Sequence, residues 1–185
     1  MPTPSLVPSW LVGERTAADA HVFIRDLASR LENRVQLTTD GLKLYINAVE
    51  DAFAGDIDYA MLYKIYDAPG GIENERRYSP AVCTGIEIRN INGFPDSRKV
   101  STSYVERQNL TMRMGMRRFT RLTNGFSRKV ENLAHAVSLH YMNYNYARPH
   151  QTLTQANDGR KTTPAMAAGL ENRVWTHRDI AALLD

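Results

Sequence analysis

The stretch Val35-Gln-Leu-Thr-Thr-Asp-Gly41 decides the expected fold. Its apolar and β-branched residues predict a short buried strand at 35–39, and the Asp-Gly pair marks the turn where that strand ends. Apolar residues then recur at helical spacing over 44–53, and residues 57–66, rich in Tyr and Ile, favour another strand. The region therefore predicts alternating strands and helices.

Upstream of this stretch the same alternation continues. Residues 6–12 have the pattern of the end of a strand that leads to Gly13. Thr16, with Asp19 three residues later, resembles a capping box, and apolar residues follow on one helical face as far as Leu31. Together these patterns predict an α/β fold.

Downstream of the second helix and its strand, the periodicity is interrupted. Proline and glycine break the pattern over about 67–100, which predicts a long irregular insertion that is mobile without ligand, with at most a short hairpin around 84–91. A basic helix is expected over 104–120. A second long helix is expected over 128–146, because Arg148-Pro149 then stops it.

Composition favours a soluble domain with a tail. The chain has 185 residues, of which 43% are hydrophobic, an ordinary share for a globular protein. The expected core covers 1–150, and the tail, 151–185, packs on it. Cys83 is the only cysteine, which excludes an internal disulfide and a multi-cysteine zinc finger and favours a reducing cytoplasm. No apolar run approaches the roughly 20 residues of a membrane helix.

Charge is distributed unevenly along the chain. Eight acidic residues and two lysines lie in 40–75, whereas seven basic residues and a single acid, Glu106, lie in 101–130. Clustered arginines neutralise phosphates and release their counterions, so the second segment favours a polyanionic partner. A solvated helix face is the alternative interpretation of the same charges.

Two acids are candidates for chemistry. Asp40 closes a strand at the end where open α/β sheets place ligand-contacting groups, although an Asp-Gly pair is also a common turn or helix cap. Glu106 is expected to share one helical stripe with three residues, which are Asn109, Arg113 and Arg117. This stripe suits a carboxylate that holds a metal beside cations that hold a DNA backbone. Alternatively, Glu106 only offsets the neighbouring arginines.

Carboxylates are the side chains that metal-dependent phosphodiester chemistry requires. Two Mg²⁺ ions about 4 Å apart activate the attacking oxygen and stabilise the leaving oxygen. Mg²⁺ is a hard ion that takes oxygen ligands, so Asp and Glu are appropriate and neither His nor Cys is needed.

Other candidate sites are weaker. Glu131 and His135 are one helical turn apart without a third ligand at zinc-site spacing, which favours a surface pair. We expect His150 to cap or pack the tail, and Cys83 has no visible partner base for a nucleophilic role. The alternating methionines of 112–116 are expected to fill the core.

Several motifs occur in a specific combination. They are Ser103-Tyr-Val-Glu-Arg-Gln-Asn-Leu-Thr-Met-Arg113, Arg117-Arg-Phe-Thr-Arg121, Tyr144-Asn-Tyr-Ala-Arg-Pro-His150 and Thr163-Pro-Ala-Met-Ala167. With them, the chain resembles the C-terminal half of bacterial DDE insertion-sequence transposases over nearly its whole length. The resemblance implies the RNase-H-like core of retroviral integrases, followed by additional C-terminal helices.

The resemblance also implies roles for particular residues. Asp40 would be the second and Glu106 the third catalytic, metal-binding carboxylate, for two Mg²⁺ ions that Mn²⁺ can replace. The implied activity is cleavage and strand transfer of double-stranded DNA at element ends and target, by a homo-oligomer in the bacterial cytoplasm. The resemblance places Arg113 on DNA near the site. With the charge pattern added, the expected DNA-binding residues are Asn109, Arg113, Arg117, Arg118 and Arg121.

The chain departs from the family pattern at its start. The first Asp of the family would fall near Met1, yet no Asp precedes Asp19, which is expected in a helix and not on a central strand. We therefore expect a core truncated at its amino terminus, without the upstream DNA-recognition domain and inactive alone. The alternatives are a noncatalytic DNA-binding or multimerisation fragment that modulates a full-length transposase, and a remnant that does not fold.

Overall fold

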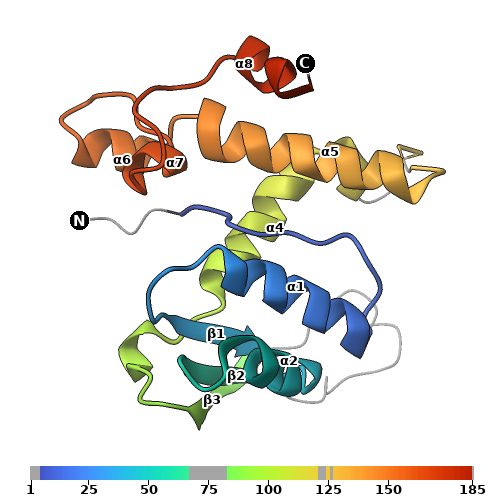
Figure 1. Ribbon diagram of the computed structural model, residues 1–185, viewed down its shortest axis with the longest axis vertical. Coiled ribbons are helices and arrows are strands. Elements are labelled where there is room, and N and C mark those ends of the chain that lie inside the picture. The colour runs from blue at the N-terminus through green and yellow to red at the C-terminus, as the bar shows by residue number, and fades with distance from the viewer. Residues whose placement is uncertain (1–4, 67–82, 121–123, 126, 185) are drawn as a thin grey trace. The chain divides into compact units, whose positions relative to one another are not determined.

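The computed structural model in Figure 1 describes residues 5–66, 83–120, 124–125 and 127–184. The chain divides into two compact units. We call Glu14–Val105 the sheet unit, and the combination of Met1–Gly13 with Glu106–Asp185 the helical unit.

The sheet unit is built on three strands. These are β1 (Gln36–Asp40), β2 (Asp58–Tyr66) and β3 (Cys83–Asn92), in the order β1-β2-β3. β1 runs parallel to β2, whereas β3 runs antiparallel to it. A parallel pair requires a crossover connection, which α2 (Leu44–Phe53) provides. The prediction of an α/β fold is therefore confirmed.

Helices α1 (Ala17–Ser29) and α2 pack against each other and on one face of the sheet (Figure 1). Their shared core contains Ile24, Val49 and Met61, each at most 1% exposed. The strand residues Tyr59 and Met61 alternate with Ala60 and Leu62, which face the other side of the sheet, where Val100 covers them. Burial of this apolar face is what holds the two helices to the strands.

The predicted helix ends are confirmed at the residues that cause them. Thr16 Oγ1 accepts the Asp19 backbone N–H at 3.2 Å, so the side chain caps the first turn of α1. α2 ends where Ala54 (φ 47°) and Gly55 (φ 85°) adopt left-handed conformations, and the Ala54 N–H donates to the Glu50 carbonyl at 2.9 Å.

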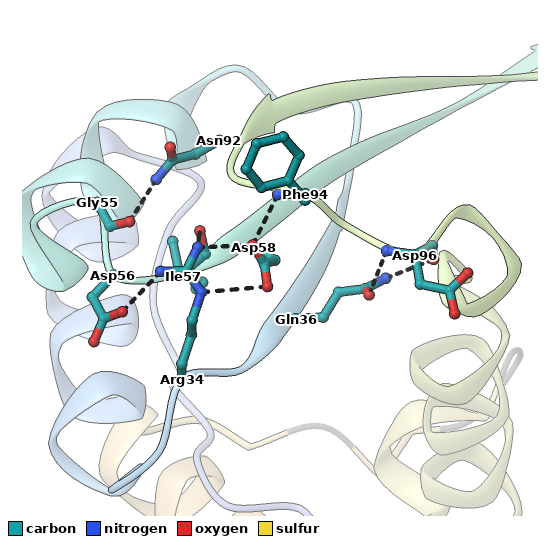
Figure 2. Close-up of polar contacts among 9 residues, drawn as sticks. All are labelled: Arg34, Gln36, Gly55, Asp56, Ile57, Asp58, Asn92, Phe94 and Asp96. Atoms are coloured by element: carbon teal, nitrogen blue, oxygen red, sulfur yellow. Dashed lines mark hydrogen bonds and ion pairs between the residues drawn. The ribbon is translucent and has the colours of Figure 1, made fainter.

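An arginine joins the amino ends of the strands to the turn after β3 (Figure 2). Arg34 donates to Asp58 Oδ1 and to Asp56 Oδ1, each at 2.8 Å. Asp58 Oδ1 also accepts the Phe94 backbone N–H at 2.9 Å. The hydrogen bond from Arg34, followed by that from Phe94, lowers the pKa of Asp58, so the carboxylate is ionised where it holds this turn.

A glutamine adds a second connection at the same end of the sheet (Figure 2). Gln36 Nε2 donates to the Asp96 carbonyl at 3.0 Å, and its Oε1 accepts the Asp96 N–H at 2.9 Å. The turn that follows β3 is therefore fixed to the starts of both β1 and β2, before the chain continues into η1 (Ser97–Lys99).

The helical unit is assembled from short helices and two longer ones. They are α4 (Ser103–Gly115), which begins at the end of the sheet unit, η2 (Arg117–Phe119), α5 (Val130–Met142), the π-helix η3 (Asn143–Ala147), α6 (Gln151–Ala156), α7 (Pro164–Ala167), α8 (His177–Ala181) and η4 (Ala182–Leu184). None of the helices described is both long and apolar enough to cross a lipid bilayer.

The π-helix η3 is the centre of the helical unit. Asn145, 4% exposed, donates to the Val7 carbonyl at 2.8 Å and accepts the Val7 N–H at 3.0 Å. The Trp175 backbone N–H donates to the Tyr146 carbonyl at 3.0 Å, and the centroids of the two rings lie 4.6 Å apart. Segments from both ends of the chain therefore meet on five consecutive residues.

Three sequence predictions about elements were wrong. Residues 6–12 form no strand, because Val7 is held by the Asn145 side chain and not by a neighbouring strand. The predicted hairpin around 84–91 is a single long strand, β3, while residues 67–82 of the expected insertion lie outside the described part of the chain. The basic helix ends at Gly115 and not near Thr120.

Candidate functional site

Asp40 lies where the sequence predicted it, at the carboxyl end of β1. It pairs in register with Leu62 of the parallel strand β2, which continues in the same direction to Tyr66. The side chain is exposed, and its Oδ1 accepts the Leu42 backbone N–H at 3.2 Å. This bond gives the Asp-Gly turn expected from the alternative interpretation, and it leaves the carboxylate accessible to solvent. The turn and the ligand role are compatible.

Tyrosines surround the end of β1, a feature that the sequence analysis missed. The Tyr59 hydroxyl, on a residue only 1% exposed, shares a 2.8 Å hydrogen bond with Thr39 Oγ1. Burial, and then the negative charge of Asp40, raise the pKa of Tyr45. Burial also raises the pKa of Tyr59, to which the Asp40 charge adds. These phenols stay protonated and neutral beside the carboxylate.

Glu106 lies in the first turn of α4 and is exposed. The amino end of a helix carries a partial positive charge, which favours a carboxylate there. Asp40 belongs to the sheet unit and Glu106 to the helical unit. Each unit therefore contributes one of the two predicted ligands.

The donor chemistry of these two acids suits Mg²⁺, since both offer carboxylate oxygens. The number of ligands is too small for a complete site. Among the described residues, no group of three or more His, Cys, Asp or Glu side chains could hold a metal ion. A metal held by Asp40 or by Glu106 would therefore need further ligands, such as water or a bound phosphate.

Four of the five expected DNA-binding residues lie in the described part of the chain. Asn109, Arg113, Arg117 and Arg118 are all exposed. Arg117 does not share the helical stripe of Glu106, because Met116 is extended (φ −124°, ψ 108°) and Arg117 begins η2. Arg118 is engaged within the fold: its Nη1 donates to Ser127 Oγ at 2.6 Å and to the Asn132 carbonyl at 3.0 Å. Arg121 lies outside the described residues.

The weaker candidates gain no ligand geometry among the described residues. Glu131 and His135 are both exposed and belong to no metal-binding group. His150 packs its ring 4.5 Å from that of Tyr144, as the packing expectation had it, although its side chain makes no capping hydrogen bond to α6. Cys83 is exposed and donates to the Gly85 carbonyl at 3.4 Å. Met114 is 80% exposed, so the expectation of core filling is wrong for it.

A comparison with protein-family models finds no match, and no curated protein or solved structure matches the chain either.

Proposed function

We propose that this chain acts in DNA transposition as part of a DDE-type transposase with an RNase-H-like core. The observation that carries the proposal is the place of Asp40, an exposed carboxylate at the carboxyl end of a strand that is parallel to its neighbour. Open α/β sheets bind ligands at this edge. The proposal is supported by Glu106 near the start of α4, whose exposed face also presents Arg113.

Asp40 and Glu106 would hold the divalent ions, and the exposed Arg113 and Arg117 would bind the phosphates of the DNA backbone. The ions, when bound, lower the pKa of the attacking water or 3′-hydroxyl and neutralise charge on the leaving oxygen. A third carboxylate is needed for the complete family site, and the proposal assigns two, Asp40 and Glu106. The cleavage test therefore supplies a further Asp.

A noncatalytic role in DNA binding is the second candidate. It is favoured by the absence of a three-ligand metal group in the described residues, while Arg113 and Arg117 remain exposed. In this case the chain would bind DNA, or associate with a complete transposase, without cutting.

The test is cleavage and joining of DNA that carries candidate element ends, with Mg²⁺ or Mn²⁺, by a protein extended upstream with a strand that bears an Asp. We expect Asp40→Asn and Glu106→Gln each to abolish the reaction. Glu131→Gln is the matched control, because it too is an exposed Glu in the first turn of a long helix of the helical unit. An active Glu106→Gln protein would reject the assignment.

Salt dependence of DNA binding by the chain itself separates the remaining outcomes. The slope of log affinity against log salt should fall by about 1 for each of Arg113→Ala and Arg117→Ala. Arg160→Ala, exposed but outside the basic segment, should leave the slope unchanged. Salt-dependent binding without cleavage by the extended protein supports the noncatalytic candidate, and binding that is insensitive to salt contradicts both.

A further inference from the structure

The residue that follows Asp40 is in unusually close contact with a tyrosine ring of β2. A Cβ atom placed on Gly41 would lie 2.5 Å from Cδ1 and 2.6 Å from Cε1 of Tyr63. The φ angle of Gly41 is outside the left-handed region, so the backbone conformation does not require glycine here. Glycine is needed because the ring occupies the space of a side chain.

The strand register explains this contact. Asp40 pairs with Leu62, and the next residues along the two parallel strands are Gly41 and Tyr63. The turn after β1 therefore rests on the first ring beyond the last paired position. Because the contact involves carbon atoms of the ring, it depends on the shape of the ring and not on the hydroxyl group.

The Tyr63 ring is itself fixed by β3. The guanidinium carbon of Arg89 lies 4.8 Å from the ring centroid, a cation–π distance. Arg89 is in turn oriented by Glu87, whose Oε1 accepts its Nε–H at 2.7 Å. The Tyr63 hydroxyl donates to Met61 Sδ at 3.7 Å. Contacts from two strands thus hold the ring against which Gly41 packs.

We propose that Tyr63, acting through Gly41, is a positioning residue that sets the orientation of the Asp40 carboxylate. The Leu42 N–H bond to Asp40 Oδ1 links the carboxylate to the same three-residue turn. A displaced Gly41 would therefore move the hydrogen-bond donor that holds Asp40. The inference rests on the proposed function only for its consequence, which is that metal affinity at Asp40 depends on Tyr63.

The experiment compares Gly41→Ala, Tyr63→Ala, Tyr63→Phe and the Gly41→Ala/Tyr63→Ala double variant of the full chain. Two NMR readouts are recorded: the amide shift of Leu42 with the carboxyl ¹³C shift of Asp40, and the broadening of the signals of residues 40–42 by Mn²⁺. Gly85→Ala is the control, since its Cβ would meet only the Ile65 side chain, with Cδ1 at 3.5 Å and Cβ at 3.8 Å, which are ordinary contacts. Circular dichroism confirms that each variant is folded.

We expect Gly41→Ala to shift both Leu42 and Asp40 signals and to weaken Mn²⁺ affinity about tenfold or more, the usual effect of losing a group that orients a metal ligand. The double variant should lie closer to wild type than Gly41→Ala, because removing the ring makes room for the methyl group. Tyr63→Phe and Gly85→Ala should behave like wild type.

The two proposals fail in distinguishable ways. Unchanged Leu42 and Asp40 shifts in both Gly41→Ala and Tyr63→Ala would overturn the positioning role, whatever Mn²⁺ does. Additive effects in the double variant would overturn it as well, because the two residues would then act independently. Shifts that follow the expected pattern, while Mn²⁺ broadens none of the wild-type signals, would support positioning and reject Asp40 as a metal ligand. If Gly41→Ala does not fold, Tyr63→Ala decides between the outcomes: shifted Leu42 and Asp40 signals support the positioning role, and unchanged signals overturn it.

Discussion

The sheet unit and the helical unit are stabilised in different ways. The sheet unit is continuous in sequence, and its core is a set of apolar side chains from α1, α2 and β2. The helical unit joins two distant parts of the chain, which the Asn145 side chain of η3 connects through its two hydrogen bonds to Val7. The first depends on burial in a core that one continuous stretch of chain supplies. The second also buries apolar side chains, among them Val137, Leu153 and Ile180, but it depends in addition on a buried amide that joins its two parts.

The largest expected effect is in the apolar core of the sheet unit. Ile24→Ala should destabilise that unit by about 2–5 kcal/mol, because Ile24 of α1 is 1% exposed in the core shared with α2 and β2. Hydrogen exchange of β2 amides measures it. Both tryptophans, Trp10 and Trp175, lie in the helical unit, so the transition seen by tryptophan fluorescence should move less. Val22→Ala, on the same helix but 57% exposed, is the control. If Ile24→Ala lowered the stability measured by hydrogen exchange and by tryptophan fluorescence equally, the two units would not be stabilised separately.

A glycine pair separates backbone strain from packing. Gly93 (φ 66°) and Gly159 (φ 81°) both adopt left-handed conformations, so alanine at either position should cost roughly 1–2 kcal/mol. A Cβ on Gly93 would also lie 2.2 Å from Asp58 Oδ1 and 2.9 Å from the Ile57 carbonyl, whereas none of the described atoms lies within 4 Å at Gly159. Thermal denaturation should therefore show a larger loss for Gly93→Ala. Equal losses would mean that the polar network of Figure 2 yields to the methyl group.

The next effect concerns the polar centre of the helical unit. Asn145→Ala removes both hydrogen bonds to the partly buried backbone of Val7, and because a fully buried group without a partner costs about 1–3 kcal/mol, the loss should be near the lower end of that range. We expect a matching decrease in the free energy of unfolding followed by tryptophan fluorescence. Asn132→Ala, whose side chain is exposed in α5, should change it little. A neutral Asn145→Ala would contradict the role of η3 as the centre of the unit.

The smallest effect, a pH dependence, should separate the two units. Burial, and then Arg148, lower the pKa values of His140 and His150. A lowered histidine pKa means that the unfolded chain binds protons first, so the helical unit should lose stability as pH falls through about 6.5. In the sheet unit, hydrogen bonds from arginines lower the pKa values of Asp58 and Asp96. The stability that these two carboxylates contribute is therefore lost only as pH falls below about 4.

Measurements of unfolding at pH 5 and pH 7 test this difference, with hydrogen exchange of β2 amides for the sheet unit and tryptophan fluorescence for the helical unit. The free energy of unfolding followed by tryptophan fluorescence should be lower at pH 5 than at pH 7. His140→Gln or His150→Gln should reduce that difference, and the exposed His135→Gln is the control. A tryptophan transition that is equally stable at both pH values would contradict the assignment.

Much of the sheet unit could be predicted from the sequence, because its elements are defined by local patterns. The apolar period of α1, the Thr16 cap and the chain reversal at Gly55 each act over a few residues. The region of β3 was predicted as a short hairpin and not as one strand, because its partner, β2, lies beyond a long intervening segment, although Ile86 and Ile88 do alternate with polar residues. Residues 6–12 were misassigned because their partner is a side chain 138 positions away.

The candidate site was predictable only in part for the same reason. The position of Asp40 at a strand end and that of Glu106 on a helix follow from local signals. The contact between Gly41 and Tyr63 depends on the register of two strands, which no local pattern specifies. Likewise, the internal hydrogen bonds of Arg118 distinguish it from its neighbours only once the fold is known.

The proposed function requires that Asp40 and Glu106 hold the same divalent ions. Mn²⁺ titration of the DNA-bound chain, followed by NMR, tests it most directly through the amide signals of residues 40–42 and 105–107. We predict that both groups of signals broaden at the same Mn²⁺ concentrations, and that Asp40→Asn or Glu106→Gln alone removes the effect at both. Broadening at residue 106 that persists in Asp40→Asn, with loss only around residue 40, would contradict the account.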